Sequence, residues 1–99
     1  MAKITKIAAT KDGTTEIYYE PSAPRQALAS LRRSGWRVAS TRIDAEAEAV
    51  RLEAHARRIL RDDPSPLSHG RVAGLRAGQC REQANAARAA AQGVGSLTS

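Results

Sequence analysis

The clearest periodic pattern of the chain lies between residues 45 and 60. Apolar residues recur there at intervals of three and four, which is the repeat of one face of an α-helix: Ala45, Ala49, Leu52, Ala56, Ile59 and Leu60. Asp44 directly precedes the pattern and is suited to cap a helix, whereas Pro64 and Pro66 cannot continue one. The pattern predicts an amphipathic helix over residues 45–60.

A different pattern opens the chain. The stretch KITKIAATKDGTTEIYY is rich in Ile, Thr and Tyr, which favour strands, and its Asp12-Gly13 pair accepts the positive φ angles of a tight hairpin turn. We therefore expect a β-hairpin at the N-terminus.

The segment that follows predicts a short helix and then a third strand. A helix over residues 23–34 has Ser22 as its N-cap and Gly35 at its C-terminal stop, with Ala27, Leu28 and Leu31 facing inward. The stretch WRVASTRI, residues 36–43, reads as a strand, but apolar and polar residues alternate too irregularly to show which face is buried.

The last third predicts a longer and weaker helix over residues 69–92, because ANAARAAAQ favours a helix and the glycines before it do not. Residues 93–99, GVGSLTS, read as a flexible tail. The expected fold is a single α+β domain over residues 1–92, in the order ββαβαα, with a small antiparallel sheet packed by helices.

Composition indicates a thin core. The chain has 99 residues, and 20 of its hydrophobic residues are alanine, with no Phe and one Trp. A chain this short leaves a large share of its surface exposed after folding, so self-association is a plausible way to bury more of it. We expect a homodimer.

The stretch HGRVAGLRAGQCREQ places three glycines on one helical face. It matches neither the phosphate-binding P-loop, which needs G-x-x-x-x-G-K-[ST], nor the dinucleotide fingerprint G-x-G-x-x-G. Its arginines exclude a lipid environment, so close packing against another helix is the expected role. The oligomer interface is assigned to Gly70, Gly74 and Gly78.

Candidate chemistry is sparse. His55, His69 and Cys80 lack the paired short spacings of a zinc site, and no nucleophile and base stand in a recognisable arrangement. Asp44, Glu46 and Glu48 are explained by the N-terminus of a helix, where negative charge is favourable. We expect no enzymatic activity, metal or cofactor.

The single cysteine fits a reducing compartment, and no apolar run is long enough for a membrane span or a signal peptide. A cytoplasmic protein without a membrane partner is expected. Its bias toward Arg and Ala suggests a GC-rich bacterial, phage or plasmid sequence.

Charge is the most informative feature. The net charge is +6, and residues 1–43 contribute +5, residues 44–63 contribute −2 and residues 64–99 contribute +3. Five arginines cluster within eighteen residues of the first block, and the glycine face continues into further arginines. Candidate phosphate contacts are Arg25, Arg32, Arg33, Arg37, Arg42, Arg71, Arg81 and Arg88.

Two functions fit this charge. The first is a small basic DNA-binding protein, a transcriptional or mobile-element regulator that contacts the phosphates of duplex DNA. The second is an adaptor or inhibitor that uses the same basic face against an acidic protein surface. Salt-dependent binding to generic duplex DNA distinguishes them.

Overall fold

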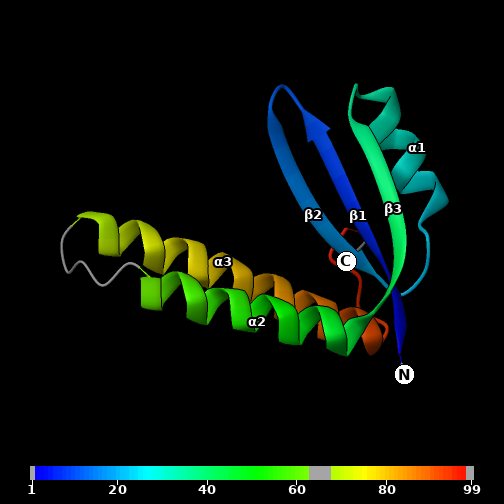
Figure 1. Ribbon diagram of the computed structural model, residues 1–99. Coiled ribbons are helices and arrows are strands. Elements are labelled where there is room, and N and C mark those ends of the chain that lie inside the picture. The colour runs from blue at the N-terminus through cyan, green and yellow to red at the C-terminus, as the bar shows by residue number, and fades with distance from the viewer. Residues whose placement is uncertain (1, 63–67, 98–99) are drawn as a thin grey trace.

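Three antiparallel strands and three helices make up the structure, a computed structural model that describes residues 2–62 and 68–97. The elements, in chain order, are β1 (Lys3–Lys11), β2 (Thr14–Glu20), α1 (Arg25–Arg33), β3 (Arg37–Asp44), α2 (Ala45–Asp62) and α3 (Ser68–Ala91). The strand order in the sheet is β2-β1-β3 (Figure 1). The α+β class and the predicted ββαβαα order are confirmed.

The N-terminal hairpin turns at the predicted pair. Lys11 is opposite Thr14, and between them Asp12 and Gly13 have φ angles of 52° and 80°. Two consecutive positive φ angles fit a turn whose twist matches that of the strands, and Asp-Gly tolerates them at low cost.

Helix α1 starts two residues later than predicted, and Ser22 is not its cap. Pro24 occupies the N-cap position without a side-chain cap, and its carbonyl accepts the Leu28 N–H at 2.9 Å. The predicted stop is confirmed: Gly35 has a φ of 93°, and the next N–H, of Trp36, returns to the Leu31 carbonyl at 3.1 Å. This six-to-one bond is the Schellman ending that glycine permits.

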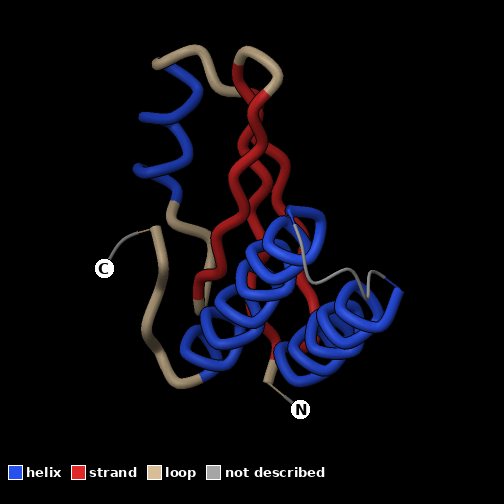
Figure 2. Tube along the Cα trace, turned by 90° about the vertical axis from the view of Figure 1, so that its left-hand side faces the viewer, coloured by secondary structure: helices blue, strands red, loops and turns tan. Residues whose placement is uncertain are grey.

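The two faces of the sheet carry different layers. On one face Ile4 and Tyr19 are fully buried against alanines of α2 and α3. On the other face Ile7 and Ala9 are fully buried, and Leu28 of α1 is 6% exposed. Figures 1 and 2 show α1 and the α2–α3 pair on opposite sides of the sheet.

Pairing with β1 resolves the facing of β3. Ile43 is opposite Ile4 and therefore lies on the α2–α3 side, whereas Val38 is opposite Ala9 and lies on the α1 side. Each face of β3 thus contributes one branched apolar residue, which explains why its sequence shows no simple alternation.

Helices α2 and α3 form an antiparallel hairpin that extends beyond the sheet (Figure 1). Its seam is small-residue packing: Ala49, Ala56, Ala77 and Ala84 are 0–1% exposed. At the far end of α2 the apolar residues of the predicted helix face are less buried: Ile59 is half-buried and Leu60 is 39% exposed. The α2–α3 hairpin therefore has a base anchored on the sheet and a tip supported only by its own two helices.

After α3 the chain crosses the outer edge of β2. The Ser96 N–H donates to the Tyr19 carbonyl at 2.9 Å, and the Tyr19 N–H donates to Ser96 Oγ at 2.8 Å. Gly95 is buried, and a Cβ at this position would overlap the Glu20 carboxylate. The described part of the segment expected to be a loose tail is therefore in hydrogen-bonded contact with β2; residues 98 and 99 lie outside the described residues.

Leu52 is the largest α2 side chain in the core and is 4% exposed. We predict that Leu52→Ala lowers the free energy of unfolding by about 2–4 kcal/mol, because the surrounding alanines have no side-chain freedom with which to fill the cavity. Urea denaturation of both proteins measures the difference. A loss below about 1 kcal/mol would show that this core is less tightly packed than the structure indicates.

Candidate nucleic-acid interface

Acidic residues of α2 form ion pairs and hydrogen bonds with other residues of the chain. Glu48 is 8% exposed, and its carboxylate accepts from Lys6 Nζ at 2.8 Å, from the Tyr19 hydroxyl at 2.8 Å and from the Arg51 guanidinium at 2.9 Å. Lys6 lies on β1 and Tyr19 on β2, so this carboxylate joins two strands to α2. A buried charge is tolerated where it is paired and hydrogen-bonded in this way.

The pKa values follow from this cluster. Burial acts to raise the pKa of Glu48, but the hydrogen bonds from Lys6, Tyr19 and Arg51 outweigh it and hold that pKa below its usual value. Burial, and secondarily the hydrogen bond to Glu48, raise the pKa of Tyr19 well above its usual range. The carboxylate and the neutral phenol are therefore the stable forms at neutral pH.

Arg88 holds a second pair of α2 carboxylates. Its guanidinium donates to both oxygens of Glu53 at 2.8 and 2.9 Å and to Glu46 at 3.1 and 3.2 Å. The hydrogen bonds from Arg88 lower the pKa of Glu53. Arg88 was predicted to contact phosphate, and in the structure its donors are occupied by these carboxylates.

Arg42 is similarly occupied. Its guanidinium donates to Thr5 Oγ1 at 3.1 Å, to the Pro21 carbonyl at 3.0 Å and to the Lys3 carbonyl at 3.3 Å. These bonds tie β3 to β1 and to the segment between β2 and α1. Arg42 therefore stabilises the sheet instead of extending freely into solvent.

The remaining arginines of the first block are exposed. Arg25 begins α1, Arg32 and Arg33 end it, and Arg37 begins β3. Within residues 2–62 and 68–97, none of these four forms an ion pair.

Arg32 and Arg33 at the end of α1 and Arg37 at the start of β3 lie at the same end of the sheet, with Arg37 on the α2–α3 side of the sheet and α1 on the other side. Lys11 is also there, since its Nζ donates to the Ser34 carbonyl at 2.8 Å and lies 5.9 Å from the centre of the Trp36 ring. We call this group, Lys11, Arg32, Arg33 and Arg37, the sheet-end basic surface.

A second group was missed in the sequence. Arg57, Arg58 and Arg61 are exposed on the outer half of α2. Arg76 and Arg81 of α3 are exposed as well, and Arg81, a predicted phosphate contact, lies in the half of α3 nearer the base. The net charge of −2 over residues 44–63 concealed the three arginines of α2, because that sum also counts Glu46, Glu48 and Glu53, which are paired with other residues. The signal was present in the spacing, since three and four residues on a helix return to the same side. We call Arg57, Arg58 and Arg61 the hairpin basic surface.

The predicted glycine interface lies partly within the residues whose side chains are described. A Cβ added at Gly74 or Gly78 would meet no atom within 4 Å, so neither glycine is required for close packing inside the chain. Gly70 and Arg71 lie outside the residues whose side chains are described. The assignment of these glycines to a dimer interface stays a prediction.

The described part of the chain brings together no candidate metal ligands. Cys80 is half-buried and His55 is exposed, and no three His, Cys, Asp or Glu residues come together there as a metal site. Among the described residues no helix combines the length and apolar character that crossing a membrane requires. Comparison with protein-family models, curated proteins and solved structures finds no match to this chain.

The Glu48 cluster generates a pH prediction. A depressed folded-state pKa means that Glu48 contributes stability above its unfolded pKa of about 4.5 and that this contribution is lost as the pH falls through the folded value. We expect Glu48→Gln to cost about 1–3 kcal/mol at pH 7 and to make unfolding less pH-dependent below pH 5.

Urea melts between pH 3 and pH 7 measure both effects. Glu82→Gln removes an exposed carboxylate outside this cluster and serves as the control, with an expected wild-type profile. An identical acid dependence for wild type and Glu48→Gln would contradict the role assigned to Glu48.

The open space at the glycines generates a further prediction. Gly74→Ala should raise the free energy of unfolding by about 0.5–1 kcal/mol, because alanine favours the helix and meets no neighbour. Light scattering of the same variant tests the dimer. If Gly74 lies at a close helix contact between two copies, the variant will instead dissociate at concentrations at which the wild type is dimeric.

Proposed function

We propose that this protein binds nucleic acid by contacting backbone phosphates through its two basic surfaces. The observation that carries the proposal is how the charged residues are paired. Glu46, Glu48 and Glu53 form ion pairs within the chain, whereas most of the arginines are exposed. The net charge of +6 is therefore concentrated on side chains that are available to a polyanion.

Arginine is well suited to this role. Its planar guanidinium offers paired donors to phosphate oxygens, and it keeps its charge at any physiological pH. On the sheet-end basic surface, Arg32 and Arg33 follow one another in the last turn of α1, and Arg37 begins the next element. Short spacing on rigid elements lets several phosphates be contacted together without reading the bases.

The hairpin basic surface gives the proposal a second point of contact. It lies on the part of the α2–α3 hairpin that extends beyond the sheet, where no strand covers it (Figure 1). The long axis of the molecule is 45 Å, more than one turn of duplex DNA, which is about 34 Å. In this proposal the protein is a small cytoplasmic regulator, not an enzyme, and Arg42 and Arg88 support the fold instead of contacting DNA.

The test is titration of labelled duplex and single-stranded DNA at several salt concentrations. If about four phosphates of the duplex are contacted, log affinity falls against log salt with a slope near −3.6, and Arg32→Ala/Arg33→Ala reduces its magnitude by roughly 2. Arg57→Ala/Arg58→Ala measures the hairpin basic surface in the same way.

The matched control is Arg32→Lys/Arg33→Lys, which keeps the charge and should keep most of the slope. Both Arg32 and Arg33 are exposed, so the melting transitions of all variants should remain close to that of the wild type. Absence of binding at low salt, or equal affinity and slope for the double alanine variant, would contradict the proposal and favour an acidic protein as the partner of these arginines.

A further inference from the structure

Strand β2 is an edge strand that is only partly covered. It pairs with β1 on one side, and no strand follows it on the other. Pairing with β1 is continuous from Thr14 to Glu20 without a bulge, and the segment from Thr14 to Tyr18 contains neither Pro nor Lys. Bulges, prolines and lysines are the features with which proteins usually prevent an exposed edge strand from pairing with another chain.

The orientation of the free backbone groups follows from Tyr19. Its N–H and C=O point away from β1, because both bond to Ser96. Along a strand these groups alternate from side to side, so the backbones of Ile17 and Thr15 point outward as well. Within the described residues neither has a backbone partner on that side.

The chain itself shows that this edge accepts a partner. Ser96 satisfies the outward groups of Tyr19, and the C-terminal segment then continues to Glu20, where the Leu97 N–H bonds to the carboxylate at 2.8 Å. Ser96 therefore covers the edge of β2 at Tyr19, and the edge between Thr15 and Ile17 remains open.

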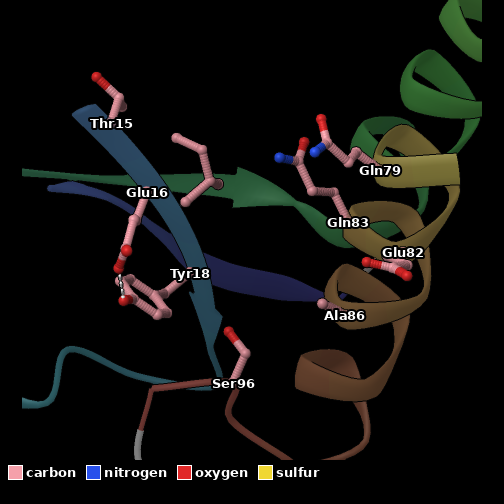
Figure 3. A pocket seen from close by; sticks show the side chains of 9 residues that line it. Thr15, Glu16, Tyr18, Gln79, Glu82, Gln83, Ala86 and Ser96 are labelled. Carbon is pink, nitrogen blue, oxygen red and sulfur yellow. Dashed lines mark hydrogen bonds between the residues drawn. The ribbon is translucent and has the colours of Figure 1, made fainter. Parts of the chain in front are cut away.

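This open part forms one wall of a groove. The opposite wall is α3, with Gln79, Glu82, Gln83 and Ala86, and Ser96 closes one end (Figure 3). The two glutamines are four residues apart and so lie on the same side of the helix. Their amides can donate to and accept from an extended main chain.

The charge of the groove is opposite to that of the rest of the protein. Glu16 and Glu82 line it, and no Lys or Arg does. Glu16 also accepts the Tyr18 hydroxyl. A groove with two carboxylates in a chain of net charge +6 selects for lysine or arginine side chains and against a nucleic-acid phosphate.

We propose that this groove binds an extended basic peptide segment, which adds a fourth strand beside Thr15 and Ile17 of β2. Main-chain hydrogen bonds supply the attachment, and Glu16 and Glu82 select basic side chains. A second copy of β2 fits less well, because it would bring its own Glu16 and Glu20 to an edge that is already acidic. The site is separate from the two basic surfaces and does not depend on nucleic-acid binding.

The experiment starts with a displayed library of random octapeptides selected on the full-length protein. We expect enriched peptides to combine strand-forming residues with Lys or Arg on both sides of the strand, because Glu16 and Glu82 lie on opposite sides of β2. A synthetic copy of one enriched peptide is then titrated against Thr15→Pro, which removes one outward N–H, and against Thr15→Ala, which keeps it. Binding should be at least tenfold weaker to the proline variant, unchanged within about twofold for the alanine variant, and several-fold weaker to Glu82→Gln at low salt.

Thr15→Pro leaves the β1 ladder intact, since proline is tolerated at an edge strand where the N–H faces outward. Amide hydrogen exchange of the wild type gives an independent readout: the peptide should slow exchange at Thr15 and Ile17 and leave Tyr19 unchanged. The proposal is overturned if no peptide is enriched, if Thr15→Pro binds with wild-type affinity, if protection appears elsewhere, or if the edge proves to be occupied by a second copy of the chain.

Discussion

The arrangement of the molecule depends on the need to neutralise one buried carboxylate. Glu48 lies where α2 meets the sheet, and an unpaired charge there would destabilise the fold strongly. Lys6, Tyr19 and Arg51 each bring a donor to it from a different element or turn. Because these three donors must converge on one carboxylate, the position of α2 against the sheet is fixed by polar geometry as well as by the apolar contacts of Ile4 and Leu52.

A second feature is that the carboxylates of α2 are paired within the chain. The carboxylates of the first half of α2 are turned toward lysine and arginine of other elements, and Arg88 alone binds two of them. What remains outside is mainly guanidinium. Ion pairing does not change the net charge of +6, but it decides where that charge lies. Because Arg88 and Lys6 pair with acids of α2, other arginines are left without an acidic partner, which makes this protein a candidate for binding polyanions.

The sequence predicted best those features that depend on neighbouring residues. The Asp12-Gly13 turn, the Gly35 helix stop and the Asp44 cap, whose Oδ1 accepts the Glu46 N–H at 3.1 Å, are all local and are all found. Ser22 failed as a cap because the helix begins after Pro24. The type of a capping residue is therefore not sufficient by itself to locate the start of a helix.

The features that the sequence could not supply involve distant residues. The pairing of Glu53 with Arg88 spans 35 positions and that of Tyr19 with Ser96 spans 77. Among the candidate phosphate contacts, Arg32, Arg33 and Arg37 are exposed and stay a prediction, whereas Arg42 and Arg88 are held by partners that no local pattern indicates. The net charge of residues 44–63 also hid the hairpin basic surface, because a net charge gives a buried acid and an exposed arginine equal weight.

The alanine seam of the α2–α3 hairpin has a mechanical consequence. Alanine has no side-chain rotamers, so a seam of such residues cannot adjust by rotamer change when the helices are displaced. We therefore expect the two helices to respond to a force at the tip as one stiff unit, anchored to the sheet at the Glu48 cluster.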